Sequence, residues 1–592
     1  MSAFLNLPQP PPGKLTPALL ALQKAATAQL PGSGFSTNMR PLRERRTAPL
    51  HPFIVSDDAP CPQNQLMVQG FEWYIPPDHQ HWRRLSQILP SLSHLGVSHL
   101  WIPPACKAAH GPDGNGYDIY DLYDLGEFPQ KGSTGTKWGT KEELVDLTQI
   151  ASEQYGVKIL FDAVLNHKTG ADFKEQCWGK QVDPKDRRVE LDNESQELEG
   201  WTGFEFPGRQ GRYSGMKWTK EHFTGIDYDD RTKRHGVWKL GGKEWAEDVD
   251  EELGNYDFLM FADIDHRHPD VKADIFHWVK WLSRQLKIGG LRVDAIKHYS
   301  FRFLRDLLRH IDREVNDQWF IVGEYWREDS EFLAKFIEFM DHRISLFDVQ
   351  LVSNFSRISL AEEKGDLRKL LDDTLALWKP DNAVTFVVNH DTQNGQSLET
   401  PVLPFFIPLA YAVILLRANT GLPCVFYADL YGSFGPPQPN TQGYVKFTPP
   451  TSGGAILPKM MLARKLWAYG TQYDYFGESH CVGFTRCGHV SQSRGDGVAV
   501  VMTNAWECAS KRMFVGRQHA GEIWTDLLKW CFGQVVIDGE GWGVFPVGPR
   551  SVSVWVNSTA EGRAGVDSFT FDFDIYGLYK QQESTPIATI TR

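Results

Sequence analysis

Four short strings of this sequence carry residue types that could do chemistry. Each string ends or follows an apolar, β-branched run that predicts a buried strand. The strings are Asp162–His167, Gly290–His298, Val322–Glu324 and Val388–Asp391. Three carboxyl groups, those of Asp294, Glu324 and Asp391, therefore stand at the ends of three different predicted strands. One such acid alone is usually a helix N-cap or an ion-pair partner, but four strings in order argue against coincidence.

Converging acids beside an arginine suit the hydrolysis of a glycosidic bond, which needs one proton donor and one carboxylate facing the anomeric carbon. Arg292 lies two residues before Asp294 on one strand and points to the same side, so we expect it to keep Asp294 ionised as the nucleophile. Glu324 is then the general acid and base, and Asp391 holds the sugar in its distorted form. Like charges held close raise one pKa, so one acid can stay protonated near neutral pH.

Three other residues of these strings take supporting roles in this hypothesis. His167 and His390 are expected to donate hydrogen bonds to sugar hydroxyls. Asp162 is expected to support Arg292 or the backbone at the strand end.

The elements that position these residues are eight predicted strands with helical segments between most of them. The strands are Leu66–Phe71, Ser98–Ile102, Lys158–Leu165, Gly290–Ala295, Trp319–Gly323, Ser345–Gln350, Ala383–Val388 and Leu422–Tyr427. The helical segments include Lys141–Tyr155, Val271–Leu286, Phe301–Val315 and Leu367–Leu377. Eight β/α units predict an α/β fold, the closed parallel (β/α)8 TIM barrel, whose active site lies at the C-terminal strand ends.

Two stretches fall outside the eight-unit pattern. The region after the third strand is too long for a structureless loop, which predicts an inserted small domain. Strand-like runs separated by turns follow the last barrel helix and predict a C-terminal antiparallel β-domain. The predicted boundaries are 1–61 for a disordered leader, 62–167 and 271–469 for the barrel, 168–270 for the insert, 470–558 for the β-domain and 559–592 for a tail. Within the tail, Phe569–Tyr579 is a candidate added strand.

Composition narrows the function classes. The chain has 592 residues and a net charge of −12 without a long basic block, which disfavours binding to nucleic acid or to an anionic membrane. The apolar stretches are too short to span a bilayer. Eight scattered cysteines form no CxxC pair, so we expect reduced thiols. With no secretory signal in the sequence, the expected location is the cytoplasm, and we expect a monomer. The alternative prediction for the basic leader is a weak transit peptide.

Taken together, the four strings resemble the motifs of the α-amylase family of glycoside hydrolases, known as family 13, over about residues 62–557. The nearest likeness is to bacterial liquefying α-amylases and their intracellular fungal relatives. That likeness rests on four further strings: Gln69–Tyr74, Asp121–Phe128, Phe206–Arg209 and Leu259–Asp265. The resemblance implies the same roles for the three acids as the chemistry above.

The resemblance also implies residues that contact the sugar. Tyr117 matches the tyrosine that stacks on the sugar at the cleavage point. Lys297 and His298 match contacts on the leaving-group side, and Tyr325 and Trp326 match aromatic lining of that side. Ordinary barrel packing remains an equal alternative for Trp326.

A structural calcium ion between barrel and insert is a further implication, since calcium prefers carboxylate, amide and carbonyl oxygens. The matching ligands are Asn166, Asp257, Asp263 and the backbone carbonyl of His298. The bacterial enzymes carry a second metal cluster in the insert. Its aligned positions here are Thr224, Ala246, Asp265 and Arg267, of which only Asp265 is acidic. We therefore expect a single calcium ion, with the Arg267 guanidinium filling the vacated charge.

The predicted function is retaining endo-hydrolysis of α-1,4-glucosidic bonds in starch, glycogen or maltooligosaccharides through a covalent glycosyl-enzyme intermediate. One alternative is a 4-α-glucanotransferase acting on maltooligosaccharides. A silent glucan-binding protein is another, and the three intact acids argue against it. A different α-glucosidic specificity also stays open, because fold-level likeness does not decide specificity.

Overall fold

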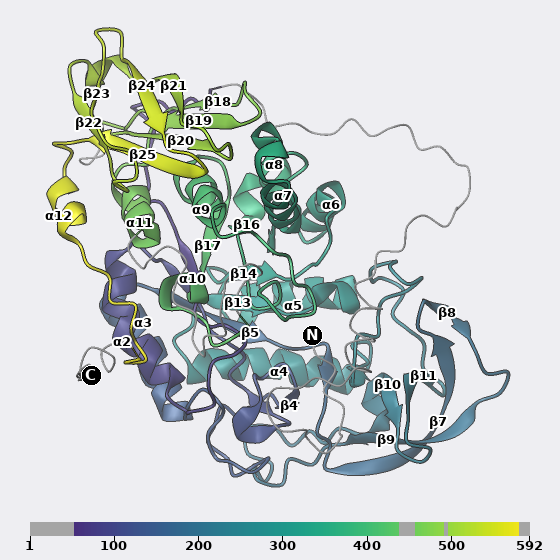
Figure 1. Ribbon diagram of the computed structural model, residues 1–592. Coiled ribbons are helices and arrows are strands. Elements are labelled where there is room, and N and C mark those ends of the chain that lie inside the picture. Colours follow the sequence, from purple (N-terminus) through teal and green to yellow (C-terminus); the bar gives the residue numbers. More distant parts are fainter. Residues whose placement is uncertain (1–51, 437–455, 491–494, 579–592) are drawn as a thin grey trace, which may run out of the picture.

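A computed structural model describes residues 52–436, 456–490 and 495–578 of the chain. Its centre is a closed barrel of eight parallel strands in the order β1-β17-β16-β15-β14-β13-β5-β2 (Figure 1). The strands are β1 (Met67–Gln69), β2 (His99–Trp101), β5 (Lys158–Ala163), β13 (Gly290–Val293), β14 (Phe320–Gly323), β15 (Ser345–Phe347), β16 (Ala383–Phe386) and β17 (Leu422–Phe426). Each observed strand lies within one of the eight predicted strand ranges, so the TIM-barrel prediction is confirmed.

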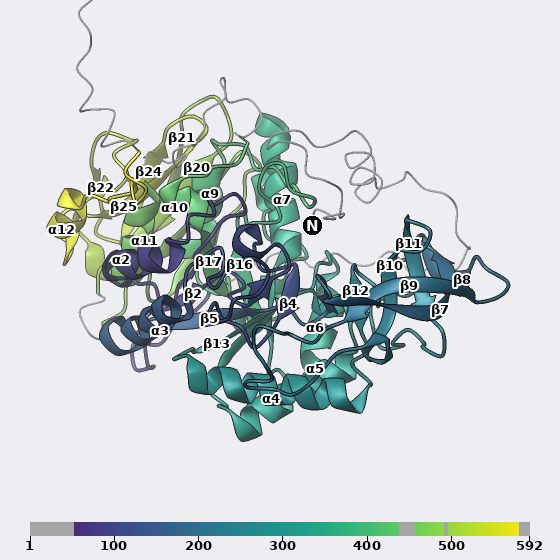
Figure 2. The ribbon, with the colours of Figure 1, turned by 90° about the horizontal axis from the view of Figure 1, so that it is seen from below.

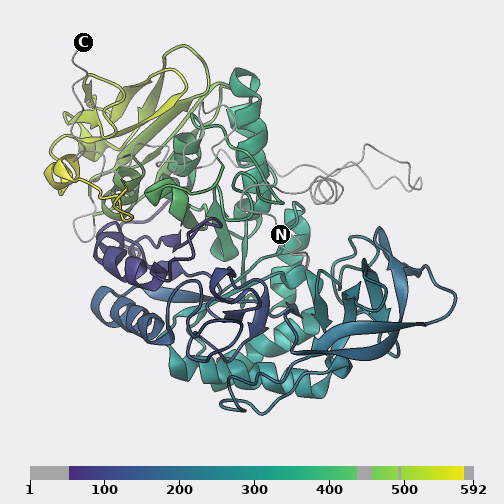
Figure 3. The ribbon, with the colours of Figure 1, turned by 60° about the horizontal axis from the view of Figure 1, so that its bottom comes forward.

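Helices cover the outside of the barrel, as apolar parallel strands require. They are α2 (His81–His94), α3 (Lys141–Tyr155), α4 (Pro269–Gln285), α5 (Phe301–Glu314), α6 (Ser330–Phe339), α7 (Val349–Leu360), α8 (Leu375–Trp378), α9 (Ile407–Leu416), α10 (Tyr427–Tyr431) and α11 (Ile456–Leu466). Sequence signals at both ends of α3 explain its bounds. Thr140 and Glu143 form a capping box, and Gly156 ends the helix with a left-handed φ of 64°. The α2 and α3 helices pack side by side, in purple and blue in Figure 3.

Two predicted elements were wrong in extent. The strand predicted for Ser345–Gln350 stops at Phe347, because the Asp348 carboxylate accepts the backbone N–H of Leu351 at 3.1 Å and starts α7. The helix predicted for Leu367–Leu377 is two short pieces, a 3₁₀ turn at Leu367–Lys369 and the single turn α8. Asp373 between them has a φ of 56°, which no α-helix accommodates.

The insert after β5 is a twisted β-sheet. Its order is β6-β12-β10-β11-β7-β8, with β9 also paired to β7. The strands are β6 (His167–Lys168), β7 (Phe173–Asp183), β8 (Asp186–Glu190), β9 (Gln196–Gly203), β10 (Phe223–Asp229), β11 (Arg234–Leu240) and β12 (Ala262–Ile264). A small hairpin of β3 (Lys107–Ala108) and β4 (Ile119–Asp121) lies next to β6. Figure 2 shows the insert at one end of the molecule and the C-terminal strands at the other.

The C-terminal region is antiparallel, as predicted. Its main sheet has the order β18-β19-β20-β25-β22-β23, and β21 pairs with β24. The strands are β18 (Gln472–Tyr475), β19 (Cys481–Arg486), β20 (Val498–Thr503), β21 (Ala509–Phe514), β22 (Ile523–Asp526), β23 (Val535–Val536), β24 (Trp542–Val547) and β25 (Ser551–Asn557). Buried aromatic and β-branched side chains from both sets of strands form its own core.

The two ends of the chain differ in part from expectation. Residues 1–51 of the predicted leader lie outside the described residues, but Phe53 forms an antiparallel bridge with Gln472. In the tail, α12 (Arg563–Ser568) precedes residues 569–578, which form no strand, so the candidate strand there is wrong as far as its residues are described. None of the helices in the described part of the chain has the length and hydrophobicity of a membrane span. The cysteines from Cys106 onward are free thiols, as expected.

Candidate active site

Strand register brings the first two predicted catalytic acids together. In the parallel pair β13–β14, Val293 lies opposite Gly323, so the next residues, Asp294 and Glu324, leave their strands side by side. On the other edge of β13, Arg292 pairs with Asp162 of β5. The C-terminal ends of three adjacent strands therefore converge on one point.

One guanidinium links the three acids at this point. Arg292 Nη1 donates to Asp162 Oδ1 at 2.8 Å and to Asp294 Oδ1 at 2.6 Å, and Nη2 donates to Glu324 Oε2 at 2.8 Å. The Arg292 side chain is 1% exposed, so water does not weaken these charge-assisted bonds. The predicted support of Arg292 by Asp162 is confirmed. We call Arg292, Asp162, Asp294 and Glu324 the carboxylate cluster.

The backbone after β13 is strained toward Glu324. Ala295 has a φ of 51°, a left-handed conformation that costs a non-glycine residue of order 1–3 kcal/mol. In that conformation its N–H donates to Glu324 Oε2 at 3.0 Å, and the N–H of Ile296 donates to the Glu324 carbonyl at 3.1 Å. The strained turn thus fixes the position of Glu324 relative to Asp294.

The charge balance of the carboxylate cluster leaves room for a proton. Burial raises the pKa of Asp294 well above its ordinary value, and the carboxylates of Glu324, Asp162 and Asp391 raise it further, although Arg292 opposes them. Burial likewise raises the pKa of Asp162 against the pull of Arg292. Asp162 and Asp294 share the Arg292 cation, so the protonation of one affects the other. Arg292 is the group that opposes burial here and favours the ionised form of Asp294.

The third acid follows β16. The Asn389 side chain accepts the backbone N–H groups of Asp391 and Thr392 at 3.0 and 2.8 Å, which fixes the turn that presents Asp391. His390 Nδ1 lies 3.0 Å from the amide nitrogen of Gln69, which donates to it, so the ring proton is on Nε2, 3.4 Å from Asp391 Oδ2. Burial and Arg292 hold the pKa of His390 well below its ordinary value, so the ring is neutral.

Two carboxylate oxygens remain available at the centre. Asp294 Oδ2 and Asp391 Oδ1 are buried and have no hydrogen-bond partner among the described residues. Unsatisfied buried oxygens are costly in a purely structural site and are expected where a ligand completes the hydrogen bonding. Electrostatic coupling places Asp391 close enough to affect the pKa of Asp294.

Parallel aromatic rings flank these acids. Tyr117 stacks on His390 with ring centres 5.1 Å apart, and Trp73 stacks on both rings at 5.9 and 6.1 Å. The Tyr117 hydroxyl donates to Asp162 Oδ2 at 2.9 Å. Trp73 lies in the string Gln69–Tyr74 but has no role among the sequence-based predictions. Flat faces of this kind suit contact with a sugar ring.

His167 lies next to the backbone of Tyr117. It is completely buried, and its Nε2 donates to the Tyr117 carbonyl at 2.9 Å. Burial lowers its pKa to about 4, so the ring is neutral. The structure thus gives His167 a contact that positions Tyr117, and its Nε2 proton is already used.

The residues predicted for the leaving-group side are only partly brought together. Lys297 Nζ donates to Glu252 Oε2 at 2.6 Å and to the Trp326 carbonyl at 3.2 Å, so these two residues adjoin. Tyr325 does not line an open surface. It is fully buried, and its hydroxyl donates to Asp250 Oδ2 at 2.7 Å. The Nδ1 of His298 bonds the Tyr256 carbonyl at 2.9 Å.

A second acidic group, the insert cluster, consists of Asn166, Asp257 and Asp263. Burial raises the pKa of Asp257 to about 8 and that of Asp263 well above its ordinary value, with Asp257 raising the latter further. Asn166 Oδ1 is buried without a hydrogen-bond partner in the part of the chain that the structure describes. Two buried acids that repel each other and an amide oxygen without a hydrogen-bond partner form a set of hard oxygen donors. This donor set fits calcium.

The positions aligned with a second metal cluster are filled by protein groups. The Thr224 hydroxyl donates to Asp263 Oδ2, and the N–H of Ala246 donates to Asp257 Oδ2 at 2.8 Å. Asp265 pairs with Lys243 Nζ at 3.0 Å and with Arg267 Nε at 3.4 Å. Although burial opposes them, these cations hold the pKa of Asp265 below its ordinary value.

One further group of potential ligands does not fit a metal. Ring nitrogens or carboxylate oxygens of His222, His268 and Asp270 lie within 4.8 Å of one another. However, His222 Nδ1 accepts the N–H of Thr219 at 2.9 Å, and His268 Nδ1 accepts that of Asp270 at 3.3 Å. A neutral imidazole that accepts at Nδ1 carries its proton on Nε2, so the lone pair that a metal needs is missing.

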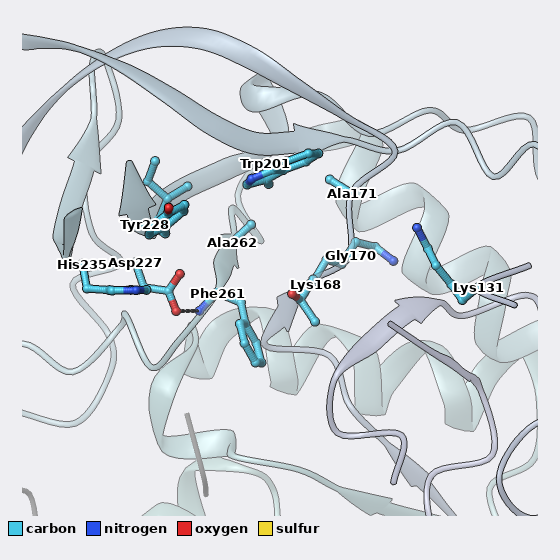
Figure 4. Close-up of a pocket in the computed structure, with 12 residues that line it drawn as sticks. Lys131, Lys168, Gly170, Ala171, Trp201, Asp227, Tyr228, His235, Phe261 and Ala262 are labelled. Carbon is cyan, nitrogen blue, oxygen red and sulfur yellow. Dashed lines mark hydrogen bonds between the residues drawn. The ribbon is translucent and has the colours of Figure 1, made fainter. Parts of the chain in front are cut away.

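A pocket of about 250 Å³ is lined mostly by residues of the insert (Figure 4). Trp201, Tyr228 and Phe261 give it aromatic walls. Phe261 has a φ of 57°, held by the Asp227 carboxylate, which accepts its N–H at 2.8 Å. Its ring centre is 5.3 Å from that of His167. The pocket therefore adjoins the residues behind Tyr117.

Sequence comparisons agree with this geometry. The family model described as "Alpha amylase, catalytic domain" matches residues 81–446, and "Alpha-amylase C-terminal" matches residues 499–556. An "Alpha-amylase" of Bacillus licheniformis is 44% identical over 493 residues, which cover 83% of this chain and 93% of that protein. The "Cytoplasmic alpha-amylase" of Escherichia coli strain K12 is 38% identical over 500 residues, covering 83% and 99%.

Solved structures share the fold. An α-amylase from Geobacillus thermoleovorans, crystallised with acarbose, superposes with a TM-score of 0.53 at 16% identity, over 83% of this chain and 98% of that one. A Malbranchea cinnamomea α-amylase gives 0.52 at 17% identity, over 84% and 97%. From the matched catalytic model and the close relatives, the chain belongs to the α-amylase family of glycoside hydrolases.

Proposed function

We propose that this enzyme hydrolyses internal α-1,4-glucosidic bonds of starch, glycogen or maltooligosaccharides with retention of anomeric configuration. The observation that carries the proposal is the Arg292 guanidinium, which binds Asp294 and Glu324 at once. One guanidinium can hold two carboxyls at the separation of about 5–5.5 Å that is typical of retaining enzymes, and this supports retention over inversion.

The proposed first step uses both carboxyls. The protonated Glu324 donates its proton to the glycosidic oxygen while an Asp294 oxygen attacks the anomeric carbon. The carbon–oxygen bond to the leaving sugar breaks, and a glycosyl ester to Asp294 forms. Glu324 suits the acid role because it is 9% exposed, the most accessible of the three acids. Asp294 suits the nucleophile role because its Oδ2 has no other partner among the described residues.

The second step returns the enzyme to its starting state. The Glu324 carboxylate takes a proton from water, the water oxygen attacks the anomeric carbon, and the ester bond to Asp294 breaks. Asp391 and the His390 Nε2 proton are placed to bind hydroxyls of the distorted ring. Tyr117 and Trp73 would stack on sugar faces beside them.

Calcium is the proposed structural cofactor. Asn166, Asp257, Asp263 and the His298 carbonyl would hold a single ion between barrel and insert, which neutralises the two acids when bound. Asn166 Nδ2 lies 3.4 Å from His167 Nδ1 and can donate to it, which leaves the amide oxygen for the cation. Through His167, this same link reaches Tyr117. We propose that the basic side chains paired with Asp265 take the place of a second metal ion.

The aromatic pocket of the insert is the proposed seat of a longer glucan chain. Trp201 is 36% exposed and lines the pocket together with Tyr228 (Figure 4). A chain that passes Tyr117 and His390 would meet it next. The proposed partner is thus an α-glucan, and we propose a cytoplasmic monomer. The E. coli relative described as cytoplasmic supports that location.

The test is a product profile on maltoheptaose, with the anomeric form of new ends followed by proton NMR. Internal hydrolysis with retention predicts products shorter than seven units whose new reducing ends appear first as the α-anomer. Products longer than the input would favour the 4-α-glucanotransferase alternative. First appearance of the β-anomer would refute retention. No turnover with intact Asp294 would favour the silent glucan-binding alternative.

A further inference from the structure

A cavity of about 530 Å³ lies at the opposite end of the barrel from the acids. Phe320 and Leu422, which begin β14 and β17, line it. Residues 53–65 close one side, and the start of the C-terminal domain closes another. Because barrel catalysis takes place at the C-terminal strand ends, this cavity is separate from the glucan site.

Three nearly buried arginines line the cavity. Arg417, Arg464 and Arg486 are 6%, 8% and 7% exposed. Arg417 forms a two-pronged ion pair with Asp474, with N–O distances of 3.1 and 2.6 Å. Its charge is therefore neutralised within the protein.

Among the described residues, the hydrogen-bond partners of the other two guanidiniums are backbone carbonyls. Arg464 donates from Nε to Gln65 at 3.0 Å and from Nη1 to Leu415 at 2.6 Å. Arg486 donates from Nε to Gly470 at 3.1 Å. Within the described ranges, no carboxylate pairs with either side chain. Arg464 Nη2 and both terminal nitrogens of Arg486 therefore have hydrogen-bonding capacity to spare.

The electrostatic setting is unfavourable without an anion. Burial lowers the pKa of Arg464 to about 9, and Arg486 lowers it further by repulsion. Burial also lowers the pKa of Arg486 to about 10, with Arg417 adding to the effect. The acid that lines the cavity besides these arginines, Asp381, is exposed. In a protein of net charge −12, two buried and unneutralised cations on one cavity point to a negatively charged occupant.

We infer that this cavity, the arginine pocket, binds a small sugar phosphate, with Arg464 and Arg486 holding the phosphate. Guanidinium groups present a rigid fork that matches phosphate oxygens. The volume is larger than a phosphate ion needs, so an organic part has room. The remainder is lined by polar side chains such as Gln63 and Asn419 and by apolar ones such as Phe53, Val55 and Leu422. This mixture suits a sugar, which has both hydroxyl groups and apolar ring faces.

Occupancy has a consequence for stability. The ligand would contact the segment 53–65, the barrel and the C-terminal domain together, an arrangement that exists only in the folded protein. A ligand that binds the folded state alone raises the unfolding temperature. Because the pocket is remote from Asp294 and Glu324, binding need not change turnover at saturating starch.

The experiment measures thermal unfolding and calorimetric binding of the full chain with three probes: glucose 6-phosphate, inorganic phosphate and glucose. Sodium chloride at matched ionic strength is the baseline. The expected result is a concentration-dependent rise in unfolding temperature with both phosphates, larger with glucose 6-phosphate, and none with glucose. A rise with inorganic phosphate equal to that with glucose 6-phosphate would overturn the sugar-phosphate assignment. No rise above the baseline with either phosphate would overturn the site itself.

Variants locate the site. Arg486→Gln should weaken glucose 6-phosphate binding about tenfold or more, as expected for loss of a charged hydrogen bond. Arg517→Gln, an exposed arginine paired with Glu540, is the matched control and should bind like wild type. If Arg486→Gln does not fold, Arg486→Lys keeps the charge without the fork and should show an intermediate loss. Equal affinity in the folded Arg486 variant and in the control would contradict the assignment.

Discussion

The carboxylate cluster and the insert cluster lie close together at the C-terminal end of β5 but balance their charge in different ways. In the first, Arg292 bonds directly to three acids. In the second, the partners of Asp257 and Asp263 are neutral: a backbone N–H and the Thr224 hydroxyl. The cluster proposed for chemistry contains its own cation, Arg292, so the charge of its carboxylates is balanced within the protein. For the second we propose a calcium ion taken from solution.

Removing the proposed nucleophile should give the largest effect. Asp294→Asn removes the attacking oxygen charge but keeps the shape, so we expect turnover of starch to fall by about 10⁴-fold or more. The matched control is Asp381→Asn, an exposed acid at the other end of the barrel, which should keep wild-type turnover. Wild-type activity in Asp294→Asn would refute the nucleophile assignment.

Replacing Arg292 tests how much its charge contributes to the stability of the folded protein. Arg292→Gln leaves Asp162, Asp294 and Glu324 buried together without a guanidinium. Breaking a buried ion pair in this way costs about 3–5 kcal/mol, so we expect a clear fall in the denaturant midpoint at neutral pH. The fall should shrink in acid, where the carboxyls are neutral. A variant as stable as wild type at pH 7.5 would show that Arg292 does not carry the charge balance.

Removing the cation from solution should affect the insert cluster alone. If calcium is bound at about 1,000 times its dissociation constant, it contributes about 4 kcal/mol, so a chelator should lower the unfolding temperature of the wild type. Asp263→Asn removes a proposed ligand and should make the protein less stable and nearly insensitive to the chelator. Calcium titration by calorimetry should give one ion per chain. Two ions, or a chelator effect unchanged in Asp263→Asn, would contradict the single-site account.

The smallest expected effect is the loss of folding stability that follows from the raised pKa of Asp294. Since the folded state holds the Asp294 proton more tightly than the unfolded chain, the stability contribution of this group falls as the pH rises above about 3.9, the ordinary pKa of aspartic acid. Asp294→Asn does not ionise, so it should unfold at a higher temperature than wild type at pH 7.5. The difference should disappear toward pH 4. A difference independent of pH would indicate that packing, and not ionisation, sets it.

The sequence predicts the barrel well because its strands are short apolar runs, and two of the proposed catalytic acids, Asp294 and Glu324, directly follow such a run. The meeting of Asp294 and Glu324 follows from those runs once β13 and β14 are neighbours in register. Where local polar groups interrupt a pattern, as Asp348 and Asp373 do, the predicted bounds were wrong.

Other features depend on contacts between distant segments, which periodicity does not reveal. Trp73 stacks on Tyr117 and His390 only because three separate strands close one barrel. The positions of the buried His167 and Tyr325 side chains depend on single hydrogen bonds to Tyr117 and Asp250. The arginine pocket likewise joins residues of three elements that carry no motif in the sequence.

The central claim is that Asp294 forms a covalent bond to the sugar while Glu324 supplies the proton. The most direct test is to trap the intermediate with a fluorinated glucosyl fluoride, whose second step is slow, and to map the added mass by peptide mass spectrometry. The account predicts one glycosyl group per chain, on Asp294, with accumulation strongest when Glu324 is replaced by Gln. Label on Glu324 or Asp391, or inactivation without any covalent adduct, would contradict it.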